Sequence, residues 1–127
     1  MAAIDTNVLV RLLTQDDPIL TAKAEAYLLA QAPVWVSVSV LVETFYVLAR
    51  LYGWEKSALL AMLETICNSR QFIFQDQPAI VDATRQWVAA KPGFVDCLNV
   101  ALARVHGKGP MATFDKDAAM LPGAAKL

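Results

Sequence analysis

Four acidic residues stand where the chain is expected to leave a strand or to enter a helix. Asp5 follows the apolar run MAAI, and Asp115 follows the run PMATF. Asp96 opens the expected helix DCLNVALARV, and Glu43 lies in the first turns of a helix after PVWVSV. In parallel sheets covered by helices, ligands bind outside the carboxyl ends of the strands. If these strands are neighbours, the carboxylates share one crevice.

A crevice of this kind has to take up protons or bind a cation. Two unit charges about 4 Å apart repel each other by about 4 kcal/mol at an effective dielectric constant near 20. A ligand set made only of oxygen atoms favours a hard cation, Mg²⁺ or Mn²⁺, over Zn²⁺. Such a cation polarises a phosphoryl oxygen and activates a bound water. The acids therefore indicate phosphate chemistry.

The same acids have a purely structural interpretation. Asp5, Asp96 and Asp115 each stand where a helix N-cap accepts hydrogen bonds from free backbone amides. Glu43 differs, because the position three residues earlier is Val40, which cannot form a capping box. A carboxylate among the apolar neighbours of Glu43 is costly to bury without a partner.

Polar neighbours extend both interpretations. Thr6, Asn7 and Thr113 adjoin the acids, and Asn99 lies three residues after Asp96 on the same helix face. Each can support a ligating carboxylate or a bound water, and each can equally serve turn or cap chemistry. Lys116, beside Asp115, is the best placed of several cations that could contact a nucleic acid.

Composition bounds the remaining possibilities. The 127 residues predict one domain, and a net charge of −1 gives no general attraction to nucleic acid. No apolar run reaches the length of a membrane span and no signal peptide opens the chain, so we expect a soluble cytoplasmic protein. Cys67 and Cys97 are expected to be buried free thiols. The single histidine, His106, excludes two-histidine acid–base catalysis, and no P-loop, GxGxxG or GxSxG motif occurs.

Apolar patterning alternates between short strand-like runs and longer helical ones. Helices are predicted at 6–13, 18–31, 39–53, 54–69, 78–91, 94–107 and 115–121, and strands at 1–4, 33–38, 71–75 and 110–114. Pro18 and Pro78 suit first helical turns, while Gly53 and Gly107 suit helix ends. This order predicts an α/β fold with a central, mostly parallel sheet flanked by helices.

Four segments carry a family resemblance: DTNVL, the Glu in VSVLVETFYVLA, FVDCLNVALA and ATFDKDA. Together they resemble the PIN-domain family, and more narrowly the VapC toxins of toxin–antitoxin pairs. The resemblance covers residues 1–127 as a single domain. It implies a metal-dependent endoribonuclease in which Asp5, Glu43, Asp96 and Asp115 are catalytic. Asp5, Asp96 and Asp115 are then the expected ligands of Mg²⁺ or Mn²⁺, with Thr6 and Asn7 in supporting positions. It also implies a homodimer, a VapB-type antitoxin that blocks the site, and an RNA substrate such as transfer RNA.

Two alternatives stay open. One is a phosphatase with Asp5 as nucleophile, against which Asn7 stands where a second aspartate is needed. The other is a non-catalytic binding module whose acids are caps. The dense apolar segment FYVLARLYGWEKSALLAML either packs on two sides or forms a partner groove.

Overall fold

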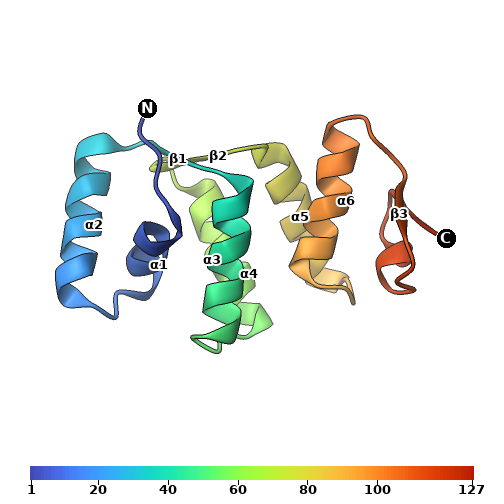
Figure 1. Cartoon of the computed structure of the whole chain (residues 1–127), viewed down its shortest axis with the longest axis horizontal. Coiled ribbons are helices and arrows are strands. Elements are labelled where there is room, and N and C mark those ends of the chain that lie inside the picture. The colour runs from blue at the N-terminus through green and yellow to red at the C-terminus, as the bar shows by residue number, and fades with distance from the viewer. The chain divides into compact units, whose positions relative to one another are not determined.

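The computed structural model describes all 127 residues, which form two compact units, Met1–Gln75 and Asp76–Leu127. The first unit holds four helices and two strands (Figure 1). In chain order they are α1 (Thr6–Thr14), α2 (Pro18–Gln31), β1 (Val34–Val36), α3 (Val38–Arg50), α4 (Lys56–Asn68) and β2 (Phe72–Phe74).

Local signals fix where these helices begin. The side chains of Asp5, Asp17 and Ser37 accept hydrogen bonds from backbone amides at the starts of α1, α2 and α3. Pro18 occupies the first turn of α2, where its missing N–H costs nothing. Gly53 has a positive φ of 68° after α3, a conformation that glycine adopts without strain.

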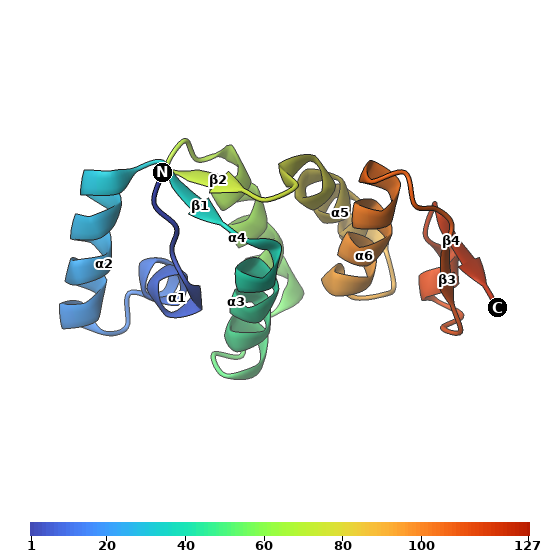
Figure 2. The same ribbon diagram turned by 45° about the horizontal axis from the view of Figure 1, so that its top comes forward.

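The sheet of the first unit is short and parallel. Val34 pairs with Phe72 and Val36 with Phe74, and all four side chains are buried between helices. Figure 2 shows the two strands side by side. Ala3 forms an isolated parallel bridge to Trp35 on the other edge of β1. The chain therefore reaches Asp5 directly from the edge of this sheet.

The second unit contains a helical hairpin and a second parallel strand pair. Its elements are α5 (Gln77–Ala89), α6 (Phe94–Val105), β3 (Met111–Thr113), the 3₁₀ helix η1 (Ala118–Met120) and β4 (Ala124–Lys126). Helix α5 packs on α6, with the rings of Trp87 and Phe94 5.8 Å apart. Met111 pairs with Ala124 and Thr113 with Lys126.

The predicted α/β class with parallel strands is confirmed, and the helices fall where the sequence predicts them to within a few residues. The strands are shorter than expected and form two separate pairs, one in each unit. Strand 1–4 is reduced to the bridge at Ala3, and residues 115–121 hold only the short η1. Strand β4 was not predicted. No helix combines the length and apolar character needed to cross a bilayer.

Candidate functional site

The first unit places Asp5 at the N-terminus of α1, where it caps the helix. Its Oδ1 accepts a hydrogen bond of 3.1 Å from the backbone amide of Val8. Its Oδ2 receives no hydrogen bond, and the side chain is exposed. The capping interpretation is thus confirmed for Asp5, yet it uses only one of the two carboxylate oxygens. Of the supporting residues, Thr6 is buried and Asn7 is exposed.

Glu43 lies on an exposed face of α3. Its carboxylate has no hydrogen-bond or ion-pair partner, and it borders a surface groove of about 480 Å³ together with Ser39, Tyr46 and Arg50. Because Glu43 is exposed, it avoids the cost that burial without a partner would carry. Thr44 and Phe45 point into the core, whereas Glu43 is turned about 100° away from each adjacent residue and faces outward.

The second unit places Asp96 in the third position of α6, after the N-cap Gly93. Asp96 therefore does not cap the helix, which corrects the cap position expected from the sequence. Its side chain is half-buried and makes no hydrogen bond. It lines a cavity of about 220 Å³ with Asn99 and Thr113, so the polar neighbours proposed from spacing meet Asp96 in one pocket.

Asp115 follows β3 and organises the turn that leads into η1. Its Oδ1 accepts hydrogen bonds from the backbone amides of Asp117 at 2.8 Å and Ala118 at 3.1 Å. The hydroxyl of Thr113 in turn accepts a hydrogen bond of 3.0 Å from the amide of Asp115. The Oδ2 of Asp115 receives no hydrogen bond. Lys116 is exposed and forms no ion pair.

Asp5 and Asp115 thus share one arrangement. In both residues, backbone amides hold Oδ1 and leave Oδ2 free, so the carboxylate is oriented and still has an oxygen to offer. Metal-ligating carboxylates are commonly held by hydrogen bonds in this way. Neither unit alone gathers three or more His, Cys, Asp or Glu side chains able to hold a metal ion. The donor set consists only of oxygen, and its type fits a hard divalent cation.

The histidine and the two cysteines lie outside the candidate site. His106 ends α6, as expected, and its Nε2 lies 3.1 Å from Oδ1 of Asp76. Cys97 is buried, and burial raises the pKa of the half-buried Cys67 thiol, which disfavours the nucleophilic thiolate. The predicted burial is confirmed for Cys97 and only partly confirmed for Cys67.

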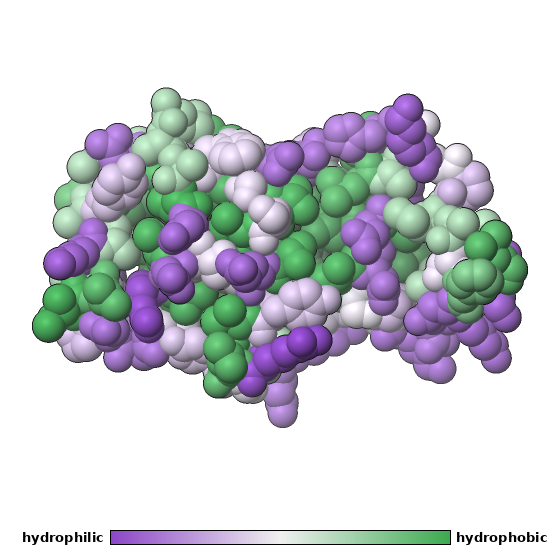
Figure 3. All heavy atoms as spheres, in the orientation of Figure 1, coloured by the Kyte–Doolittle hydropathy of each residue, from purple (hydrophilic) through white to green (hydrophobic).

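The apolar segment at α3 and α4 is divided between the core and the surface. Phe45, Leu59 and Met62 are buried, whereas Tyr46 keeps 38% of its surface exposed. Figure 3 shows apolar and polar residues alternating along the visible surface of α3. Packing therefore explains the buried positions of this segment, while Tyr46 and Leu51 remain at the surface.

The short parallel strands and the helices that pack with them define an α/β protein, with acidic side chains at strand and helix ends in each of its two units. A family model described as PIN domain matches residues 2–123, and the chain belongs to the PIN-domain family. The chain is also 27% identical over 119 residues to a protein named VapC ribonuclease from Aquifex aeolicus (strain VF5). That alignment covers 91% of this chain and 88% of the relative. The resemblance stated from the motifs is confirmed.

Proposed function

We propose that this protein is a metal-dependent endoribonuclease that hydrolyses phosphodiester bonds of RNA. Asp5, Asp96 and Asp115 are the proposed ligands of Mg²⁺ or Mn²⁺, and Glu43 completes the set of carboxylates. The observation that carries the proposal is the free second oxygen of Asp5 and of Asp115, each on a carboxylate already oriented by backbone amides.

The residues of the chain have distinct parts in the proposed reaction. When bound, the cation supplies Lewis acidity to the scissile phosphate and lowers the pKa of a water. Asp96, which has no hydrogen bond to give up, can turn toward a cation without breaking a contact of α6. Glu43, exposed and unpaired, is the proposed acceptor of the proton from the attacking water. Thr113 holds the backbone of Asp115 in place.

The similarity to a VapC ribonuclease supports the choice of RNA as substrate. It also supports a wider proposal: a VapB-type antitoxin that covers the acids, a homodimer as the working form, and a cytoplasmic location. Transfer RNA is the first defined substrate to test, and Lys116, which is exposed and unpaired, is the proposed phosphate contact beside Asp115.

The deciding experiment incubates antitoxin-free protein with total RNA and with transfer RNA in Mg²⁺, in Mn²⁺ and in EDTA. Wild type is compared with Asp96→Asn, and Asp117→Asn is the matched control because Asp117 lies in the same unit outside the proposed set. Discrete metal-dependent fragments from wild type and from Asp117→Asn, absent with Asp96→Asn, are expected. Equal cleavage by Asp96→Asn, or cleavage in EDTA, would overturn the proposal.

A further inference from the structure

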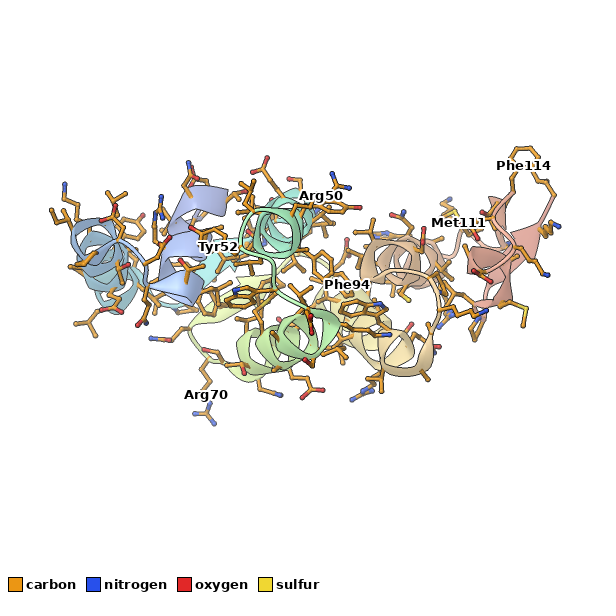
Figure 4. All side chains as sticks on the ribbon, turned by 90° about the horizontal axis from the view of Figure 1, so that it is seen from below. Arg50, Tyr52, Arg70, Phe94, Met111 and Phe114 are labelled. Atoms are coloured by element: carbon orange, nitrogen blue, oxygen red, sulfur yellow. The ribbon has the colours of Figure 1, made fainter.

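Helix α3 carries an exposed pair of side chains beside Glu43 that the proposed chemistry does not use. The guanidinium of Arg50 lies over the ring of Tyr46, with Cζ 4.8 Å from the ring centroid. Both residues border the same groove as Glu43. Figure 4 shows Arg50 projecting from the α3 ribbon.

The register of α3 places these residues on one face. Tyr46 follows Glu43 by three positions and Arg50 follows Tyr46 by four, so the three side chains form a row along the helix. Seven residues span about 10 Å along a helix axis. The pair therefore lies close to the proposed catalytic carboxylate without touching it.

The charges and contacts of the pair leave it free to bind a ligand. Arg50 forms no ion pair with any carboxylate, so its charge is not neutralised within the protein. Tyr46 is held from the side by Phe45, whose ring meets it edge-on with centroids 6.1 Å apart. The Tyr46 ring is thus in contact with a core side chain, and the Arg50 guanidinium lies over it at the surface.

We propose that Tyr46 and Arg50 form a stacking platform for one unpaired nucleobase of the RNA substrate. A nucleobase stacks on aromatic rings and on guanidinium planes alike, and the uncompensated charge of Arg50 attracts the adjoining phosphate. The substrate class in this inference rests on the proposed function. The platform then selects single-stranded RNA and positions it along α3 toward Glu43.

The test measures binding in EDTA, so that it does not depend on cleavage. A fluorescently labelled single-stranded oligonucleotide RNA is titrated with the full-length protein, and anisotropy is recorded. Tyr46→Leu is expected to weaken affinity by roughly 5- to 100-fold, the range for loss of one base–aromatic stack, whereas Tyr46→Phe keeps it. Tyr27→Leu on α2, which removes another exposed tyrosine ring, is the matched control and leaves affinity within about 2-fold.

Variants of Arg50 distinguish the contribution of its charge to RNA binding from that of its planar guanidinium group. Arg50→Lys is expected to weaken binding while keeping the salt dependence, since the charge remains and the stacking plane is lost. Arg50→Met is expected to reduce the slope of log affinity against log salt by about 0.7, the loss of one phosphate contact on a single strand. Arg70→Met, at an exposed arginine that points away from the ribbon in Figure 4, changes neither affinity nor slope beyond error.

Thermal unfolding of each variant shows that it is folded before its affinity is compared. Wild-type RNA affinity in Tyr46→Leu and Arg50→Met would overturn the platform even if the protein cleaves RNA. Loss of self-association in Tyr46→Leu, with RNA affinity intact, would overturn it too and assign the groove to a second copy of the chain. Binding that depends on the platform, in a protein that never cleaves RNA, would uphold this inference and leave the nuclease proposal to fail alone.

Discussion

The hydroxyl of Tyr52 donates a hydrogen bond of 2.7 Å to Oδ2 of Asp16, which ties the chain after α3 to the turn between α1 and α2. Arg11 Nη1 completes the cluster at 2.9 Å from Oδ1 of Asp16, and Thr14 Oγ1 lies 3.0 Å from the same oxygen. Hydrogen bonds from Tyr52 and then Thr14, with a further one from Arg11, lower the pKa of Asp16 below its usual range. The hydrogen bond to Asp16 in turn raises the pKa of Arg11.

This cluster makes stability depend on pH with a definite sign. Because the folded-state pKa of Asp16 is depressed, its contribution is present above the unfolded pKa of about 3.9 and is lost as the pH falls through the folded value. Tyr52→Phe is therefore expected to lower the melting temperature at neutral pH, and the difference from wild type should shrink as the pH falls below the unfolded pKa of Asp16. Tyr27→Phe, whose hydroxyl has no partner, should match wild type throughout. A Tyr52→Phe deficit that persists unchanged in acid would contradict this account.

Substitutions of Asp5 should separate its capping role from its charge. Asparagine caps a helix as well as aspartate does, so Asp5→Asn keeps the contact to Val8 and removes one negative charge. In EDTA this variant should be at least as stable as wild type, while Asp5→Ala should lose about 0.5–2 kcal/mol. Both should lose RNA cleavage. Urea unfolding in EDTA, paired with the cleavage assay, measures the two effects; a destabilised Asp5→Asn would count against a shared acidic site.

Asp96 should affect metal binding without affecting folding. Its carboxylate makes no hydrogen bond, so Asp96→Asn should change the free energy of unfolding in EDTA by no more than about 0.5 kcal/mol, or raise it. Mn²⁺ should raise the melting temperature of wild type, as a ligand that binds only the folded state does, and should fail to do so for Asp96→Asn. Asp117→Asn provides the comparison and should respond to Mn²⁺ as wild type does. An undiminished response in Asp96→Asn would remove it from the ligand set.

Replacing Thr44 in the core should increase the stability of the protein. Its side chain is fully buried on α3, and its hydroxyl has no hydrogen-bond partner. Replacing an unsatisfied buried hydroxyl by a methyl group of the same shape removes a desolvation penalty, so Thr44→Val should stabilise the protein by about 1 kcal/mol. Thr84→Val is the matched control, because the buried hydroxyl of Thr84 donates 2.8 Å to the carbonyl of Ile80. Chemical denaturation should show a gain only for Thr44→Val.

Helices and their ends were the most predictable part of the fold, because their signals are local. Helix α2 runs from Pro18 to Gln31 as predicted, and Gly107 takes a positive φ of 68° just after α6. Strand β4 escaped prediction because Ala124–Lys126 has little intrinsic strand preference. Its conformation is set by pairing with β3, a partner that the local sequence does not reveal.

The acids of the candidate site were proposed from their type and position, and these did not predict their individual environments. The sequence allowed Asp96 to be the N-cap of α6, but Gly93 takes that position and Asp96 lies three residues further into the helix. The surroundings of Glu43 were inferred from its apolar neighbours in sequence, but in a helix those neighbours lie on other faces. The stacked pair of Tyr46 and Arg50 was missed, although their separation of four residues on a predicted helix was a usable signal.

If Asp5 and Asp115 bind the proposed cation, their hydrogen bonds to backbone amides have an evolutionary consequence. A descendant that lost its chemistry would still need a capping side chain at both positions, so selection for folding alone would retain Asp, Asn or Ser there. An aspartate at either position in a related chain is therefore weak evidence that the chain is active. Asp96 differs, because its carboxylate accepts no hydrogen bond that the fold requires. Under the proposed function, loss of the acid at position 96 is therefore the first sequence change expected in a lineage that no longer binds the cation.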